Sequence, residues 1–379
     1  FYLIAVTIIL CAASATARYS GGSGEPDDPY LIGTPADLND IRNYPEDYNK
    51  CFLMINDINM ADYTYTTAVI APDTSSSGGF QGSYFTGIFD GNDHIIYSLD
   101  INDLGAGNDY LGLFGYIDGP SAEIKNLGVK NITIIAGNNS DYFGGICGKN
   151  IGIIKNCCTS GSAAGGTYAT YLGGICGYNE GIISNSYAIV ALIGDLSVGG
   201  FCGWNIGLID KSYSSGQVTG NGVIGGLCGK NYGTITDSFW DIYSSEQITS
   251  NGGWGLTNEQ MQHRENFHGW LDGNWKIKDG FDSPRLVWEN VEGTLISTDY
   301  PSRTYIGSGV ASDPYQIATL NDLECLSRRT SDWQNYFILK NDIDLSECNY
   351  HHALIAYGSY FTGTFDGNGN KMNNLKIST

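Results

Sequence analysis

Cysteine is the residue of this chain with the widest chemical range, and four of its ten cysteines recur in one frame. The phrase Gly-apolar-Cys-Gly occurs four times, with its cysteines 29, 26 and 26 residues apart. Thiols that recur in this way could form disulfides, bind a soft metal or fill space as small apolar groups. The four cysteines of the frame are Cys147, Cys176, Cys202 and Cys228.

The spacing favours the space-filling use of these thiols. In a stack of parallel coils they would lie about 4.8 Å apart, within reach of a bridge, but side chains that point the same way strain a disulfide. A zinc site is disfavoured because no Cys-x2-Cys pair occurs and no histidine falls near the frame. The other cysteines after residue 17 show no ligand pattern either; they are Cys51, Cys157, Cys158, Cys325 and Cys348.

Other catalytic constellations are also missing from the sequence. The nearest approach to His-Glu-x-x-His is the stretch 263–268, whose spacing is wrong. Glu180 and Asp210 fall at different positions of the repeat, so they do not form the paired carboxylates of a glycosidase. The acidic stretch 342–347 leaves calcium binding open. We therefore expect no enzymatic activity, no catalytic or metal-binding residue and no cofactor.

Large side chains occupy the position that follows the last glycine of each frame. These residues are Tyr116, Lys149, Tyr178, Trp204 and Lys230. Aromatic faces stack on sugar rings, and exposed strips of this kind are typical interaction surfaces. The alternative is that the rings only pack against neighbouring turns. The candidate ligand strip, expected to be exposed, is Tyr116, Tyr178 and Trp204.

The elements that position these side chains follow from two further columns of the repeat. An asparagine and an isoleucine keep the same register; they are Asn150, Asn179, Asn205 and Asn231, and Ile154, Ile183, Ile209 and Ile235. Self-similarity at this period indicates stacked units, and 26 residues fit three short strands and three turns, which is one coil of a parallel β-helix. The asparagines predict a side-chain ladder at turns that need a positive φ.

The frame leaves one question about the core open. Ile146 and Cys147 are neighbours in one expected strand, and both of their columns are apolar. Since side chains alternate across a strand, both cannot face inwards unless the glycine pair kinks the backbone. The sequence alone does not decide which column forms the core.

A longer repeat encloses the short one. Residues 28–30 (Asp-Pro-Tyr) return at 313–315, and residues 89–92 (Phe-Asp-Gly-Asn) return at 365–368. Within the second pair, Asp-Gly-Asn at 90–92 and 366–368 is an expected turn. Short helices are expected after Thr34 and Thr319, each an N-cap with an acidic first turn. The chain therefore contains one full cassette and the opening of a second one.

We expect six segments along the chain. The four tryptophans of the closing unit suggest that it covers the open end of the stack, with a capping box from Thr257 to Gln260. The segments are a partial secretory signal peptide (1–17), an N-terminal cassette segment with a capping helix and the first coils (18–109), the short-repeat array (110–241), a Trp-rich closing unit (242–289), a linker (290–306) and a truncated second cassette (307–379).

The N-terminus and the composition indicate where the protein is located and which partners it does not bind. Residues 1–13 are nearly all apolar and are followed by Ser-Ala-Thr-Ala, the pattern of a secretory signal with an Ala-x-Ala cleavage site. No other stretch is long enough for a transmembrane helix, so membrane contact is expected only through this signal. The formal net charge of −21 argues against nucleic acid, whose phosphates require a basic surface.

The Gly-Ile-Cys-Gly, Gly-Phe-Cys-Gly and Gly-Leu-Cys-Gly phrases, each followed by Asn-x-Gly-x-Ile, resemble the GLUG-motif repeats of large secreted bacterial proteins. The segments Ser-Phe-Trp-Asp (238–241) and Pro-Arg-Leu-Val-Trp (284–288) resemble the closing unit of such arrays. The resemblance implies an architecture, found in filamentous-haemagglutinin-like adhesins and beside the catalytic unit of IgA-cleaving metallopeptidases. Cysteine in the motif, where another apolar residue is usual, is a departure that leaves thiol chemistry open.

The sequence as a whole predicts an all-β protein, a right-handed parallel β-helix (solenoid) with short flanking helices and a Trp-rich cap. We expect a secreted or cell-surface, non-catalytic repeat scaffold of the adhesin type, whose partners are glycans or other surface proteins. The alternative is a non-catalytic β-helix part of a larger exported peptidase or carbohydrate-active enzyme. The sequence does not indicate an oligomeric state.

Overall fold

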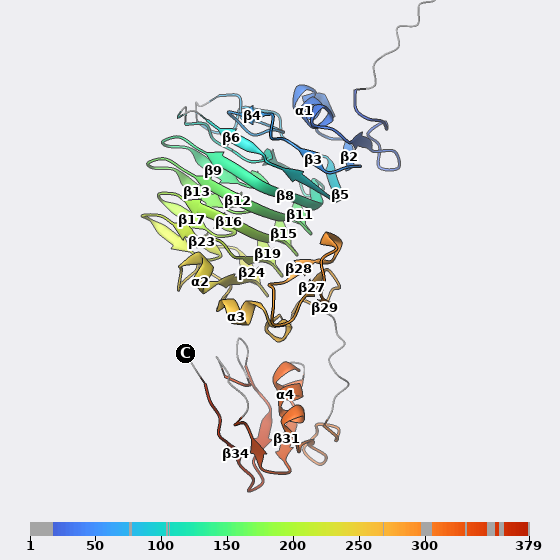
Figure 1. The fold of residues 1–379 in the computed structure, drawn as a ribbon, viewed down its shortest axis with the longest axis vertical. Helices are drawn as coiled ribbons and strands as arrows, with labels where there is room; N and C mark the ends of the chain where they lie inside the picture. Colours follow the sequence, from blue (N-terminus) through green and yellow to red (C-terminus); the bar gives the residue numbers. More distant parts are fainter. Residues whose placement is uncertain are drawn as a thin grey trace, which may run out of the picture.

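The computed structural model describes residues 18–75, 78–103, 105, 107–267, 269–296, 305–329, 332–346, 353–355 and 360–377. The expected signal peptide (1–17), His268 and part of the expected linker lie outside these ranges. In the described part, the strands of successive coils pair in parallel, which confirms the predicted parallel β-solenoid. Figure 1 shows these strands side by side along the long axis of the molecule.

The largest sheet runs through the whole first cassette. Its strands are β1 (Tyr30–Ile32), β2 (Cys51–Met54), β3 (Ile58–Asn59), β4 (Thr64–Tyr65), β5 (Ile88–Tyr97), β6 (Asp100–Asn102), β8 (Glu123–Ile135), β11 (Ile153–Lys155), β12 (Cys158–Ala164), β15 (Ile182–Ser184), β16 (Tyr187–Ile193), β19 (Leu208–Asp210), β20 (Tyr213–Ser214), β21 (Val218–Thr219), β24 (Thr234–Thr236), β25 (Phe239–Asp241) and β26 (Trp254–Leu256).

Two smaller parallel sheets complete the coils of the array. The first contains β7 (Phe114–Ile117), β10 (Cys147–Asn150), β14 (Cys176–Asn179), β18 (Cys202–Asn205) and β23 (Cys228–Asn231). The second contains β9 (Asp141–Gly144), β13 (Thr170–Gly173), β17 (Ser197–Gly199) and β22 (Val223–Gly225). Each repeat of the frame therefore contributes one strand to each of these sheets.

The four cysteines of the frame stand in register, as the spacing predicts. Cys176 pairs with Cys147 on one side and with Cys202 on the other, and Cys202 pairs with Cys228. All four are fully buried and free, so they fill space in the interior. The isoleucine column is continuous as well, from Ile124 in β8 to Ile235 in β24.

A bend between two strands resolves the question of the core. β9 ends at Gly144 and β10 begins at Cys147, and the two residues between them form a bend instead of continuing one strand. The alternation of side chains is therefore reset, and Ile146 and Cys147 are both fully buried in one hydrophobic cluster. The kink that the glycine pair permits is the reason that both apolar columns belong to the core.

The last glycine of the frame is required because the two small sheets approach each other without side chains between them. A Cβ atom on Gly177 in β14 would lie 2.5 Å from the amide nitrogen of Phe143 and 2.5 Å from the carbonyl oxygen of Tyr171. Both of these atoms belong to the backbone of the facing sheet, so neither can rotate away. This close approach explains the last glycine of the Gly-apolar-Cys-Gly phrase.

The predicted asparagine ladder is present, but its backbone differs from the expectation. Each Nδ2 donates to the Oδ1 of the next asparagine at 2.8 Å, from Asn150 through Asn179 and Asn205 to Asn231. These asparagines lie at the ends of strands, and their φ angles are not positive. Positive φ angles occur instead two residues after each isoleucine of the isoleucine column. These residues are Asn126, Asn156, Asn185, Lys211 and Asp237. The ladder therefore stabilises strand ends, not left-handed turns.

Short helices stand where the N-cap patterns predict them. α1 (Pro35–Asn43) begins at Thr34 with a capping box to Asp37, and its Leu38 and Ile41 are buried. α4 (Leu320–Arg328) repeats this box from Thr319, and α3 (Asn258–Met261) has one between Thr257 and Gln260. The expected turn at 90–92 is instead a shift of register inside β5, where Asn92 and Asp93 have positive φ. In the second cassette a turn does occur, at 368–369, which overlaps the expected 366–368.

The Trp-rich unit does more than cover the end of the stack. The segment after α2 (Ile242–Ser245) closes the end, because Ser250 Oγ accepts from the amides of Leu227 and Cys228. β26 adds one more parallel strand to the large sheet. The rest, with the antiparallel strands β27 (Trp275–Ile277) and β28 (Arg285–Leu286), packs on the outer face of that sheet. The start of the expected linker joins it, because β29 (Thr294–Leu295) pairs with β27. The expected end cap is therefore also a lateral cover.

The second cassette has a hydrophobic core of its own. Its strands are β30 (Tyr315–Ile317), β31 (Tyr336–Leu339), β32 (Ile343–Asp344), β33 (Thr364–Asp366) and β34 (Met372–Asn373). The parallel pairing of β30, β31 and β33 repeats that of β1, β2 and β5 in the first cassette. The longer repeat of the sequence is therefore a repeat of structure.

Candidate functional site

The residues of the candidate strip come from one face of one small sheet. Tyr116 lies in β7, Tyr178 in β14 and Trp204 in β18, and Tyr178 pairs directly with Trp204. The ring centroids of Tyr178 and Trp204 are 5.4 Å apart. Lys149 stands between the two tyrosines, with its Nζ 5.1 Å from the Tyr116 centroid and 5.0 Å from that of Tyr178. The structure thus brings the predicted residues together.

A second aromatic column, which was not predicted from the sequence, lies beside the first. Tyr110, Tyr142 and Tyr171 stack on one another with centroid separations of 4.7 and 5.0 Å. Tyr142 and Tyr171 stand three residues before the first glycine of their frames, a signal that was present in the repeat. Together with the first column and the rings at its ends, they form what we call the aromatic strip: Phe80, Tyr84, Tyr110, Tyr116, Tyr142, Tyr171, Tyr178, Trp204 and Tyr232.

The aromatic strip is less exposed than expected. Tyr116, Tyr178 and Trp204 are half-buried, because each packs against rings of the neighbouring coils. The most exposed rings lie at the two ends, Tyr84 at 43% and Tyr232 at 76%. The stacked column offers mainly ring edges and hydroxyls, whereas Tyr178 is turned by 77° from Tyr142 and 78° from Tyr171. A ligand would therefore meet edges, hydroxyls and a few ring faces.

The backbone beneath the second column is strained. Tyr110, Tyr142 and Tyr171 have φ angles of 57°, 62° and 56°. A bulky side chain rarely adopts this left-handed conformation, which costs on the order of 1–3 kcal/mol per residue. Glycine or asparagine would occupy the same position with less strain. The chain therefore keeps three tyrosines in this column at a cost in stability.

Charged groups interleave with the rings. Lys149 forms an ion pair with Glu180 at 2.9 Å, and the Nζ of Lys230 lies 5.2 Å from the Trp204 centroid. Burial would lower the pKa of Lys149, but hydrogen bonds to Glu180 and Tyr116 outweigh it and raise that pKa. Burial raises the pKa of Tyr116 and of Tyr178, so both phenols stay protonated and can donate hydrogen bonds at neutral pH. The buried Nε1 of Trp204 has no hydrogen-bond partner.

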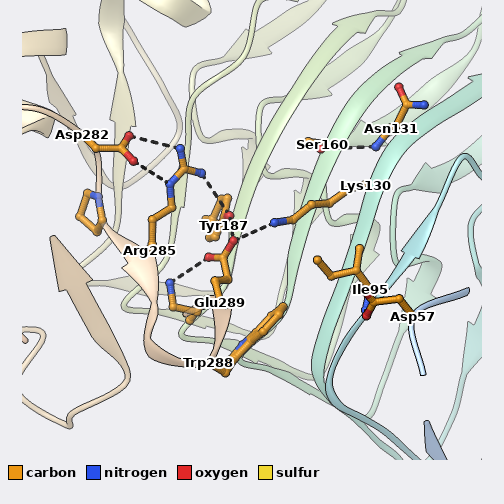
Figure 2. Close-up of polar contacts among 12 residues, drawn as sticks. Asp57, Ile95, Lys130, Asn131, Ser160, Tyr187, Asp282, Arg285, Trp288 and Glu289 are labelled. Carbon is orange, nitrogen blue, oxygen red and sulfur yellow. Dashed lines mark hydrogen bonds and ion pairs between the residues drawn. The ribbon is translucent and has the colours of Figure 1, made fainter. Parts of the chain in front are cut away.

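A second polar cluster joins the closing unit to the coils (Figure 2). Glu289 accepts hydrogen bonds from the hydroxyl of Tyr187 at 2.7 Å and from Lys130 at 2.8 Å. Its other oxygen accepts from the amide of Leu286 at 3.0 Å. Arg285 donates to the hydroxyl of Tyr187 as well, at 3.2 Å. The Glu289 side chain is only 4% exposed, so this cluster is a clasp between two parts of the fold, not an accessible site.

The thiols of the cysteine column are buried. Burial raises the pKa of Cys176, Cys202 and Cys228, which keeps these thiols protonated and unreactive. Within the described ranges, no group of three His, Cys, Asp or Glu side chains is placed to hold a metal ion. The column therefore acts through packing.

Thiol labelling should follow this burial. In the folded protein, maleimide should modify Cys51, which is partly exposed, well before any cysteine of the column. Cys147, Cys176, Cys202 and Cys228 should react only as the chain unfolds. Peptide mass spectrometry after a timed pulse measures each site. Rapid labelling of the column in the folded state would show that the stack is open there.

Comparison with known proteins gives partial matches. No family model matches the chain. Halomucin of Haloquadratum walsbyi is 31% identical over 158 residues, which are 40% of this chain and 2% of that protein. A protein of Evansella cellulosilytica named "Putative Gly-rich membrane protein" is 32% identical over 143 residues, 36% of this chain and 15% of that protein. The chain thus spans a small fraction of the curated relatives it matches.

Among solved structures, the chain is similar to the crystal structure of "a putative immunoglobulin A1 protease" from Bacteroides ovatus. The TM-score is 0.49 at 18% sequence identity, over 72% of this chain and 96% of that chain. In the described part of the present chain, no helix has both the length and the apolar character needed to cross a membrane.

Proposed function

We propose that this chain is a non-catalytic repeat scaffold of an exported, surface-associated protein, and that the aromatic strip is its contact surface for a glycan. The observation that carries the proposal is the strained column of Tyr110, Tyr142 and Tyr171. Residues held in this conformation cluster at ligand-binding and active sites. Here the column places three rings beside Tyr116, Tyr178 and Trp204.

The chemistry of the aromatic strip suits a sugar polymer. Ring faces and edges contact the C–H faces of sugars, while phenol hydroxyls, Lys149 and Glu180 supply donors and acceptors for sugar hydroxyls. In the column of Tyr110, Tyr142 and Tyr171, successive rings are one coil apart, with centroid separations of 4.7 and 5.0 Å. A chain of sugars that lies along this column therefore meets a new ring at each coil. The strip therefore favours an extended polysaccharide over a compact ligand.

The proposal also includes a location at the cell surface and membership of the GLUG-motif family. An apolar leader with an Ala-x-Ala site supports export, and one relative carries the words "membrane protein" in its name. The close approach of two sheets gives a physical reason for the glycines of a GLUG-type repeat. We include the adhesin-type role and the GLUG-motif family in the proposal on this basis.

Affinity gel electrophoresis tests the proposed glycan binding. Residues 18–379 should be retarded in gels that contain a soluble polysaccharide from a panel of neutral glucans, xylans and mannans. Replacing Tyr178 and Trp204 with alanine should weaken binding by about 1–3 kcal/mol, because truncation of contact aromatics costs that order. Tyr243→Ala is the matched control, since this ring is 69% exposed and lies outside the aromatic strip. Absence of retardation by every polymer, or equal loss in the control, would refute the proposal.

A further inference from the structure

One lysine of the array differs from all the others because it has no carboxylate partner. The array, residues 110–241, lies entirely within the described ranges and contains six lysines but no arginine or histidine. Within the described residues, Lys230 in β23 forms no ion pair, and its Nζ lies over the Trp204 ring instead. The five other lysines each pair with a glutamate or an aspartate; they are Lys125, Lys130, Lys149, Lys155 and Lys211.

Lys149 occupies the same position of the repeat as Lys230 and provides a comparison. Its Nζ lies 5.0 Å from the Tyr178 centroid, and Glu180 from the next coil pairs with it at 2.9 Å. The segment that stacks on β23, residues 247–255, contains no acidic residue that could do the same for Lys230. The ammonium of Lys230 is therefore left without compensation and attracts an anion from outside the chain.

An exposed ring stands beside this ammonium. Tyr232, directly after β23, is 76% exposed, and its centroid lies 5.7 Å from that of Trp204 with the two rings at 48°. The Nζ of Lys230 lies 5.2 Å from the same Trp204 centroid, so the ammonium and the exposed ring are neighbours. Aromatic rings pack on the C–H faces of sugars, and an ammonium donates up to three hydrogen bonds. This end of the aromatic strip offers both kinds of contact to an acidic sugar.

The charges around Lys230 favour a single carboxylate as its partner. A carboxylate carries one negative charge at neutral pH, which one ammonium balances. A phosphate carries nearly two charges and is bound best by several donors or by a guanidinium fork. The formal net charge of −21 repels a densely charged polyanion. Glu180 does not compete for the place, because it is paired with Lys149 and lies two coils away, at about 10 Å.

We propose that Lys230, with Trp204 and Tyr232, forms a subsite for the carboxylate of a uronic acid residue in the bound glycan. This inference rests on the proposed glycan binding and specifies its ligand class. The Lys230 ammonium donates to the sugar carboxylate, while Tyr232 packs against the sugar ring that carries it. Neutral sugars occupy the other rings of the aromatic strip, so the subsite adds a preference for acidic glycans to those contacts.

Paired oligosaccharides test the subsite. The probe is an oligomer of the panel polysaccharide that binds, carrying one glucuronic acid residue, and its partner is the methyl ester of the same oligomer. The two differ only in the charge of the carboxyl group. In calorimetric titrations of residues 18–379, the acid should bind about three- to fivefold more tightly than the ester, the upper range for a partly exposed ion pair. Lys230→Gln should remove this difference, and Lys230→Arg, which keeps the positive charge, should retain it.

Two further variants separate the subsite from the overall charge of the protein and from the ring. Lys371→Gln removes one positive charge from an exposed position in the second cassette and should leave the preference intact. A loss of preference equal to that of Lys230→Gln would overturn the proposal. Tyr232→Ala should weaken binding of the acid and the ester by the same factor, because it removes the ring and keeps the ammonium. Unchanged affinity of Tyr232→Ala for both would overturn the role of the ring.

The outcomes for the wild-type protein distinguish this inference from the proposed function. Equal affinity for the acid and the ester would overturn the subsite, while the binding itself would uphold the proposed function. Failure to bind either oligomer, combined with binding of the parent polysaccharide, would also overturn the subsite alone. Failure to bind any polysaccharide of the panel would refute the proposed function and this inference with it.

Discussion

Gly177→Ala should abolish cooperative folding of the short-repeat array. The added Cβ would lie 2.5 Å from backbone atoms of Phe143 and Tyr171, in the sheet that faces β14. Tyr171 lies in β13, which pairs with both β9 and β17, so its carbonyl oxygen cannot move without shifting two neighbouring strands. The two small sheets must separate over several coils, so we expect a loss of more than about 3 kcal/mol, at the high end for a single substitution. Chemical denaturation followed by circular dichroism measures it.

A matched glycine separates close packing from a general effect of the substitution. A Cβ on Gly367 would meet its nearest neighbour, the carbonyl oxygen of Asn370, only at 3.9 Å. Gly367→Ala should therefore leave the denaturation midpoint of the array unchanged. If Gly177→Ala were as stable as Gly367→Ala, the two sheets could not be in the contact described, and the reason offered for the repeated phrase would be wrong.

Glu289→Ala should detach the closing unit from the side of the solenoid. The substitution leaves the Lys130 ammonium, the Tyr187 hydroxyl and the amide of Leu286 without the carboxylate that they share. Removal of one partner from a fully buried ion pair typically costs about 3–5 kcal/mol, and the cost here should be smaller because 27% of the Lys130 side chain is exposed. The aromatic core beneath, which includes Trp275 and Tyr213, should become exposed. Thermal unfolding and light scattering should show a lower midpoint and aggregation.

The same segment contains a suitable control. Glu292 pairs with Lys278 at 2.8 Å, but its side chain is 83% exposed. Surface ion pairs contribute little, so Glu292→Ala should leave the unfolding midpoint nearly unchanged. A melting temperature of Glu289→Ala equal to that of Glu292→Ala would show that the clasp does not hold the unit in place.

Much of the fold could be predicted because each coil repeats the same residues in the same order. The cysteine, asparagine and isoleucine columns identify the register directly, and the N-cap residues identify the helices. The burial of both apolar columns could not be predicted, since it depends on the bend that Gly145 and Ile146 form between two strands. Periodicity reports which side chains alternate along a strand, but it does not report where the strand ends.

The position of the closing unit on the side of the solenoid could not be predicted from the sequence either. Its tryptophans predict that it covers apolar surface, but not which surface. The structure directs Trp275 and Trp288 to Asn185 and Asn156 on the side of the coils, through hydrogen bonds from their indole nitrogens. The aromatic strip shows the same limit. Both columns keep a fixed place in the repeat, but only the folding of one sheet onto another brings Tyr142 and Tyr171 beside the first column.

Titration of the retarded polysaccharide into residues 18–379, with the same sample assayed for new reducing ends, tests the central proposal most directly. We expect the wild-type protein to bind the polysaccharide. Replacing both Tyr178 and Trp204 with alanine should weaken the binding free energy by about 1–3 kcal/mol. No reducing ends should appear, since the strip holds its ligand without cleaving it. An affinity that is unchanged in this double variant, or polymer that is shortened by the wild-type protein, would contradict a non-catalytic scaffold that binds through the aromatic strip.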